Sequence, residues 1–173
     1  MPYDGTVSPD PNPPDVVERV SQEWARAYPD LDTQPIEVVA RVNRIATVLA
    51  HQLDLDLESH SITRSEFDVL GALARSDRPL RASEVVSTTM LSGASITKLS
   101  ERLSDLGLLQ RKKSERDGRV VLLELTDAGR ELVDIQFPRR LARDTAMLAT
   151  LSPDERSTLI ALLRKVSRTI DSR

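Results

Sequence analysis

The chain has 173 residues, 39% of them hydrophobic, and a formal net charge of −3 at pH 7. This length supports one substantial hydrophobic core, and no apolar run reaches the about 18 to 20 residues that a membrane-spanning helix needs, so no membrane partner is expected. The chain has no cysteine, which excludes disulfides and thiolate chemistry, and its two histidines, His51 and His60, lack metal-ligand spacing. We therefore expect no metal site and no cofactor.

The start of the chain carries no signal-peptide pattern, so we expect a cytoplasmic protein. Residues 1–14 contain five of the ten prolines and no apolar periodicity, which predicts a disordered arm. One extra helix is predicted within residues 15–34, because Val16, Val20 and Trp24 recur at helical spacing.

Residues 35–60 are predicted to form a long helix that opens at Pro35. Its apolar side chains repeat every three or four positions and form a broad face. They are Val38, Val42, Ile45, Leu49 and Leu53. An apolar face of this width needs a partner.

A helix-turn-helix is predicted in the middle of the chain. Thr63 and Glu66 form a capping box that starts one helix, and a short helix follows from about Arg81 to Thr88. Ser92 caps a third helix. The predicted buried stripe of this third helix consists of Ile96, Leu99, Leu103 and Leu106. The other side of the third helix is polar.

After Gly107 the apolar pattern becomes that of extended strands. Residues 109–113 and 120–125 are strand candidates, and the turn between them contains the pair Asp117-Gly118, which favours a hairpin. This hairpin is a wing. The sequence thus predicts a mainly α fold with a small β wing, in which a winged helix-turn-helix occupies about residues 61–126.

Two more helices are predicted after the wing. The first begins at Thr126 and is interrupted or kinked at Pro138, and the second begins at Ser152 and carries an apolar face. Wide apolar faces on terminal helices have few partners within one small protomer. Residues 35–60 and 127–173 are therefore expected to dimerise the protein.

Basic side chains are concentrated in the third helix and the wing. Residues 92–119 contain seven Lys and Arg against four Asp and Glu, which gives this segment a formal charge of +3 and leaves −6 for the rest of the chain. Such an asymmetry is typical of a protein that binds DNA phosphates through one surface.

The sequence resembles the MarR family of bacterial transcriptional regulators. The resemblance rests on Leu-Ser-Gly-Ala-Ser-Ile-Thr-Lys-Leu-Ser-Glu-Arg-Leu from Leu91, on Gly107-Leu108, and on Arg116-Asp117-Gly118-Arg119 leading to Leu125-Thr126 and Gly129. It covers residues 35–173. It implies a homodimer whose terminal helices interlock, and a regulator of transcription rather than an enzyme.

A recognition helix places its N-terminal part nearest the base edges of the major groove. The expected DNA-binding residues are Ser92, Ser95, Thr97, Lys98, Arg102, Arg116 and Arg119. Arg102 is expected at a phosphate, and the resemblance implies that Arg119 enters the minor groove, where a narrow A·T-rich duplex attracts a guanidinium. Asp117 is expected to orient Arg119 by a charge-assisted bond. For Arg116, a solvated charged hairpin is an equal alternative.

The N-terminal segment looks like the urate-responsive branch of that family. Position by position, this resemblance implies effector contacts from Trp24, Asp68 and Arg111. Leu99 stands where that branch has a recognition-helix arginine, which argues against urate itself and for a more apolar or differently charged aromatic effector. The alternatives are that Trp24 packs the extra helix, that Asp68 pairs with Arg111 on the surface, and that Leu99 belongs to the core.

We expect a repressor that a small aromatic or anionic effector releases from a pseudo-palindromic operator in double-stranded DNA. The alternative is a winged-helix module that binds another protein and has no effector. Salt-sensitive binding to duplex DNA distinguishes the two. The sequence shows no phosphate-binding glycine loop and no nucleophile elbow, so we do not expect an enzyme.

Overall fold

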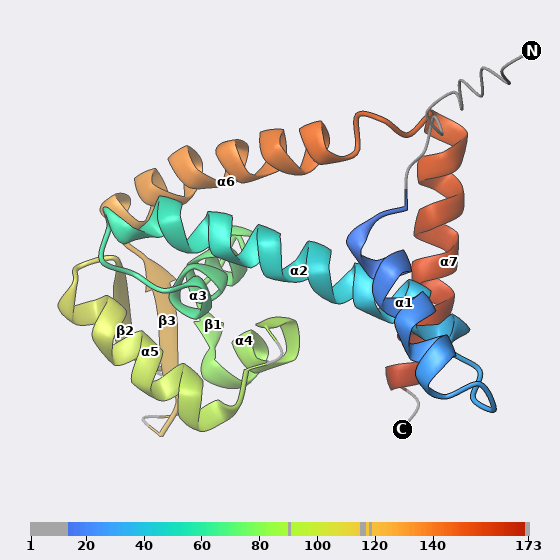
Figure 1. Ribbon diagram of the computed structural model, residues 1–173. Coiled ribbons are helices and arrows are strands. Elements are labelled where there is room, and N and C mark those ends of the chain that lie inside the picture. Colours follow the sequence, from blue (N-terminus) through green and yellow to red (C-terminus); the bar gives the residue numbers. More distant parts are fainter. Residues whose placement is uncertain (1–13, 90, 115–116, 118, 172–173) are drawn as a thin grey trace, which may run out of the picture. The chain divides into compact units, whose positions relative to one another are not determined.

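The computed structural model describes residues 14–89, 91–114, 117 and 119–171 (Figure 1). Arg116, Gly118 and, except for Pro14, the arm predicted at residues 1–14 lie outside the described residues. The chain divides into two units, residues 1–55 and residues 56–173.

The first unit contains α1 (Val16–Ala27) and the larger part of α2 (Gln34–Glu58). Asp15 caps α1, because its side chain accepts a hydrogen bond from the backbone N–H of Glu18 at 2.8 Å. The same carboxylate accepts bonds from Nε and Nη2 of Arg41 at 2.9 and 3.0 Å, and Arg41 also pairs with Glu37. One guanidinium of α2 thus connects α2 to the start of α1.

These contacts lower the pKa values of both carboxyls. The pKa of Asp15 is lowered by the backbone hydrogen bond from Glu18 and by Arg41, and the pKa of Glu37 by Arg41 and then by Ser21. Because the folded-state pKa values are lowered, the stabilisation is present above the ordinary carboxyl pKa and is lost as the pH falls through the folded-state values.

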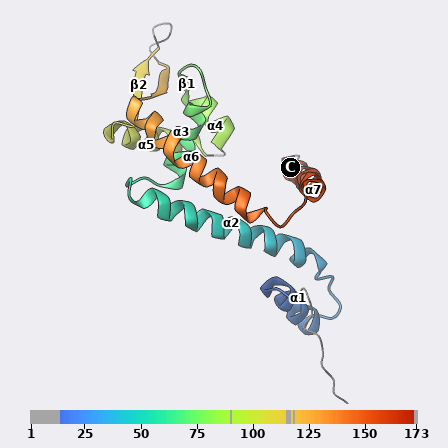
Figure 2. The same cartoon turned by 90° about the horizontal axis from the view of Figure 1, so that it is seen from above.

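The second unit begins in the last turn of α2 and holds the remaining elements. Its helices are α3 (Arg64–Ala74), α4 (Ala82–Thr89), α5 (Gly93–Asp105), α6 (Asp127–Met147) and α7 (Pro153–Asp171). Its strands are β1 (Leu80–Arg81), β2 (Leu109–Lys113) and β3 (Val121–Leu125). In two views α3, α4 and α5 gather beside the strands (Figure 1 and Figure 2). The predicted mainly α fold with a small β wing is confirmed.

The three strands form an antiparallel sheet in the order β1-β3-β2. Leu123 of the central strand pairs with Leu80 of β1 and with Arg111 of β2, and Leu123 is 1% exposed. One face of the sheet therefore covers the core. The strand β1 was not predicted, because two residues are too few to show a period of two, and α4 begins at Ala82 rather than at Arg81.

Apolar side chains of α3, α4, α5 and the sheet form the core of this unit. The fully buried ones include Val69, Leu70, Val85, Ile96, Leu103 and Leu123. The stripe predicted on α5 is correct at Ile96 and Leu103, and Leu99 is half-buried. It is wrong at Leu106, which is 43% exposed, because Leu106 is the C-cap residue and follows the last turn of α5.

The helix α6 is continuous through Pro138, so the predicted interruption is wrong there, while the alternative of a kink stays a prediction. A proline inside a helix removes the hydrogen bond to the carbonyl four residues earlier, here that of Asp134. Both residues are exposed, so water can replace the missing donor. The face of α6 that packs on the core continues on both sides of Asp134, through the buried Val133 and Gln136.

Two helices carry wide apolar faces that are exposed within the chain. On α2 the face comprises Val38, Val39, Val42, Ile45 and Val48, which are between 45% and 57% exposed. On α7 the six large apolar side chains are between 38% and 71% exposed, and they are Leu159, Ile160, Leu162, Leu163, Val166 and Ile170. Among the described helices, none combines the length and the hydropathy of a membrane span.

The start of α6 packs closely against the turn between α5 and β2. Thr126 caps α6 by accepting a hydrogen bond from N–H of Gly129 at 3.1 Å, and it donates to the carbonyl of Gly107 at 2.7 Å. A Cβ atom on Gly129 would overlap the backbone carbonyl of Leu108. Only glycine allows this approach.

We expect Gly129→Ala to lower the free energy of unfolding by about 1 to 3 kcal/mol, because the backbone of Leu108 must move. Gly93→Ala is the matched control: Gly93 begins α5, and no atom lies within 4 Å of a Cβ placed there. Urea unfolding followed by circular dichroism measures both. Equal stability of the two variants would contradict the close packing at Gly129.

Candidate nucleic-acid interface

The first two turns of α5 present an exposed polar surface. Ser92 caps the helix, its Oγ accepting a hydrogen bond from N–H of Ser95 at 3.2 Å and lying 2.8 Å from Oγ of Ser95. Thr97 donates to the carbonyl of Gly93 at 3.1 Å, and Lys98 is exposed beside it. The four candidates predicted on this helix end therefore lie together, and three are exposed while Ser95 is half-buried.

Arg102, expected at a phosphate, is bonded inside the protein. Its Nη1 donates to both carboxylate oxygens of Glu66, at 3.0 and 3.3 Å, and its Nη2 donates to the carbonyl of Ser61 at 2.9 Å. Glu66 is 0% exposed and completes the predicted capping box with Thr63, whose N–H donates to it at 2.7 Å. Arg102 therefore anchors the C-terminal half of α5 to the start of α3.

Arg102→Ala should lower the free energy of unfolding by about 1 to 3 kcal/mol. This is less than the about 3 to 5 kcal/mol for a fully buried pair, because the side chain of Arg102 is 52% exposed. Adding Glu66→Gln to the Arg102→Ala variant should recover part of this loss. The double variant no longer contains a buried carboxylate that has lost its guanidinium partner.

Chemical denaturation of the single and double variants measures this coupling, with Lys98→Ala as the control on the exposed face of α5. If Arg102→Ala leaves stability unchanged and weakens DNA binding instead, Arg102 acts at a phosphate and not as an anchor.

The wing turn is held by Asp117. Its carboxylate accepts a hydrogen bond from the backbone N–H of Arg119 at 3.0 Å, and its carbonyl accepts one from N–H of Val120 at 2.9 Å. Ser114 closes the hairpin by donating its N–H to the carbonyl of Val120, also at 2.9 Å. The charge-assisted bond expected between Asp117 and Arg119 is therefore made to the backbone N–H of Arg119. The side chain of Arg119 is exposed.

The three effector candidates are not brought together by the described contacts. Trp24, in the first unit, stacks on Tyr28 with ring centroids 5.4 Å apart. In the second unit, Asp68 lies 4.0 Å from Nη1 of Arg140. Arg111 instead pairs with Glu101 at 2.9 Å, so the alternative in which Asp68 pairs with Arg111 is wrong.

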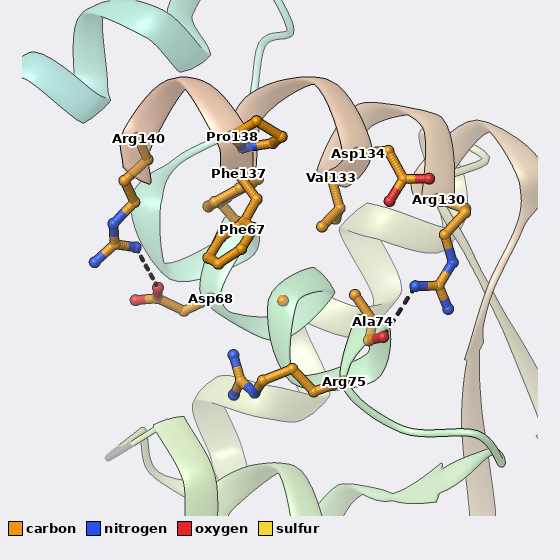
Figure 3. A pocket seen from close by; sticks show the side chains of 11 residues that line it. Phe67, Asp68, Ala74, Arg75, Arg130, Val133, Asp134, Phe137, Pro138 and Arg140 are labelled. Carbon is orange, nitrogen blue, oxygen red and sulfur yellow. Dashed lines mark hydrogen bonds and ion pairs between the residues drawn. The ribbon is translucent and has the colours of Figure 1, made fainter. Parts of the chain in front are cut away.

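A cavity of about 520 Å³ lies between α3 and α6 (Figure 3). Its polar groups are Asp68, Arg75, Arg130, Asp134 and Arg140. The apolar part of the cavity lining includes the rings of Phe67 and Phe137, together with Gly71. Arg130 donates to the carbonyl of Ala74 at 2.9 Å, which fixes one rim of the cavity. Aromatic faces beside guanidinium groups suit a small aromatic anion.

The sequence predicted Asp68 as an effector contact, and Asp68 lines this cavity. The other side chains that line the cavity were not predicted. The signal is present on α6, where Arg130, Val133, Phe137 and Arg140 follow one another at three, four and three positions and so share one face. It was missed because the helix was expected to be interrupted or kinked at Pro138.

Comparison with known proteins gives a consistent set of relatives. A model described as "MarR family" matches residues 60–120. The HTH-type transcriptional regulator PecS of Dickeya dadantii is 29% identical over 154 residues, which cover 88% of this chain and 93% of that protein. The HTH-type transcriptional regulator MhqR of Bacillus subtilis is 31% identical over 111 residues, covering 64% of this chain and 75% of that protein.

Among solved structures, the PcaV transcriptional regulator from Streptomyces coelicolor, in complex with its natural ligand, has a TM-score of 0.62 and 30% identity to this chain. The match covers 80% of this chain and 95% of that one. The family model covers α3, β1, α4, α5 and β2, and it ends one residue before β3.

Proposed function

This chain belongs to the MarR family of winged helix-turn-helix transcriptional regulators, and on that premise we propose that it is a homodimeric repressor of a pseudo-palindromic operator. One observation carries the proposal: the exposed polar start of α5 belongs to the same unit as a wing that carries Arg119. An α-helix fits the major groove, and a guanidinium suits a narrow minor groove. The proposal includes no enzymatic activity.

The exposed apolar faces of α2 and α7 support the dimer. Monomeric proteins rarely expose several large apolar side chains along whole helices, and a second copy would cover them. A two-fold dimer presents two copies of α5, so we propose operator half-sites about one helical turn apart, on the order of 34 to 36 Å.

The cavity between α3 and α6 supports an effector. Its volume lies within the roughly 300 to 1,000 Å³ of small-molecule sites, and it combines two phenylalanine rings with three arginines against two aspartates. We propose a small aromatic anion as its ligand, with Asp68 and Arg140 at its rim; the relative PcaV was solved with its natural ligand. Such a ligand releases DNA only if it prefers a conformation that binds DNA poorly.

Arg119→Ala should weaken binding to operator DNA about tenfold or more, because the minor groove loses its cation. Fluorescence anisotropy with a duplex from the region flanking the gene measures this at several salt concentrations. The matched control is Arg139→Gln, an exposed position on α6. Unchanged affinity of Arg119→Ala would reject the wing contact, and no binding by the unaltered protein in dilute salt would favour a protein-interaction module.

Phe137→Ala and Arg140→Gln should each abolish release of DNA by aromatic carboxylates such as benzoate derivatives, because the cavity loses a ring or a cation. DNA affinity without the carboxylate should stay unchanged, and Arg139→Gln, the neighbour outside the cavity, should respond like the unaltered protein. Competition titrations of the DNA complex give both quantities. Full release from the Arg140→Gln complex would place the effector elsewhere.

A further inference from the structure

A second cavity, of about 400 Å³, lies between the sheet, α5 and the start of α4. Its polar lining consists of three arginines and three hydroxyl residues, with no carboxylate among the described lining residues. These are Arg81, Arg111, Arg119, Ser83, Thr97 and Ser100. A lining of guanidinium and hydroxyl donors suits an oxyanion such as a phosphate.

Arg111 carries a hydrogen-bond donor that no residue in the described part of the chain uses. Its register with the buried Leu123 places it on the core-facing side of the sheet, and its Nη1 pairs with Glu101 at 2.9 Å. Its Nε is buried and has no hydrogen-bond partner among the described residues. A buried donor without an acceptor costs free energy, so a bound anion that accepts from Nε would remove this cost.

The other two arginines come from separate elements and leave their charges available. No ion pair with another described residue is found for the side chain of Arg81 or of Arg119, and both are exposed. The carboxylate nearest Arg81 in the chain, that of Glu84, accepts the backbone N–H of Arg81 but is itself bound to Nη2 of Arg78 at 2.6 Å. Positive charge therefore dominates the cavity.

The cavity lies between the two elements that are proposed to enter the grooves of duplex DNA. A protein that puts one helix in the major groove and a wing in the neighbouring minor groove must straddle the sugar-phosphate strand that separates the two grooves. The cavity lies between α5, which supplies Thr97 and Ser100, and the wing, which supplies Arg111 and Arg119. The strand between the grooves would therefore pass its mouth.

We infer that this cavity is a phosphate site, in which Arg81 and Arg111 hold a backbone phosphate of the strand between the two grooves. The inference rests on the proposed binding of DNA by α5 and the wing. It assigns Arg111 to DNA rather than to the effector, and it adds Arg81, from the short strand β1, to the interface.

The test compares Arg81→Gln, Arg111→Gln and the control Arg139→Gln by fluorescence anisotropy over a series of salt concentrations. Each cavity variant should bind on the order of 5- to 20-fold more weakly, to operator and to random duplex alike. The magnitude of the slope of the logarithm of the DNA association constant against the logarithm of the salt concentration should fall by about 0.9 for each lost phosphate contact. Arg111→Lys, which keeps the positive charge, should restore much of this slope. Circular dichroism checks that each variant is folded.

Different outcomes separate this inference from the proposed function. If the unaltered protein binds no duplex, both are overturned. If it binds operator DNA and the cavity variants keep its affinity and salt slope, only the phosphate site is overturned. A loss of discrimination between operator and random duplex at unchanged slope would also overturn it, because the arginines would then act on bases.

A last measurement distinguishes DNA phosphate from free phosphate. The Nε–H resonance of Arg111 in an NMR spectrum should shift on adding operator duplex. A shift with inorganic phosphate alone, together with unchanged DNA binding by the Arg111→Gln variant, would show a site for free anions and overturn the assignment to DNA.

Discussion

The second unit depends on one buried carboxylate. Glu66 closes the capping box of α3 and at the same time accepts hydrogen bonds from the guanidinium of Arg102 in α5, so the proposed recognition helix α5 is fixed to the helix that lines the α3–α6 cavity. A buried carboxylate is tolerated only when it is fully bonded, and here it receives a backbone N–H, a hydroxyl and a guanidinium. The orientation of α5 therefore follows from the same contacts that start α3.

Charge is distributed unevenly along the chain. Outside residues 92–119 the chain is acidic, and several cations near the interface are neutralised within the protein: Lys112 by Glu124, Arg78 by Glu84 and Arg102 by Glu66. At the start of α5 and in the cavity beneath the wing, Lys98, Arg81 and Arg119 have no ion pair among the described residues, whereas Arg111 pairs with Glu101. A count of basic residues in the sequence thus overestimates how many are available to phosphates. The structure shows which of these side chains are already paired with a carboxylate.

The sequence predicted what is encoded locally. The caps at Thr63 and Ser92, the apolar periods and the Asp-Gly turn each act within a few residues, and the helices and wing strands follow them. Partners distant in the chain were not predictable: Asp68 lies by Arg140 because α3 packs on α6, and Arg111 pairs with Glu101 because β2 packs beside α5. Nor could the sequence show that Pro138 sits on an exposed face, where an intact helix can accommodate it.

Consecutive residues of the short helix α3 contact different parts of the second unit. Glu66 holds α5, while Phe67 and Asp68, the next two residues, border the cavity shared with α6. Eleven residues are too few to bend independently at the two places, so a molecule that shifts Phe67 also shifts the support of α5. For the proposed effector, thermodynamic reciprocity would act in both directions: the factor by which the effector lowers the affinity for the operator is the factor by which the operator lowers the affinity for the effector. Under that proposal, protein saturated with DNA would be a poorer sensor than the same protein free in solution.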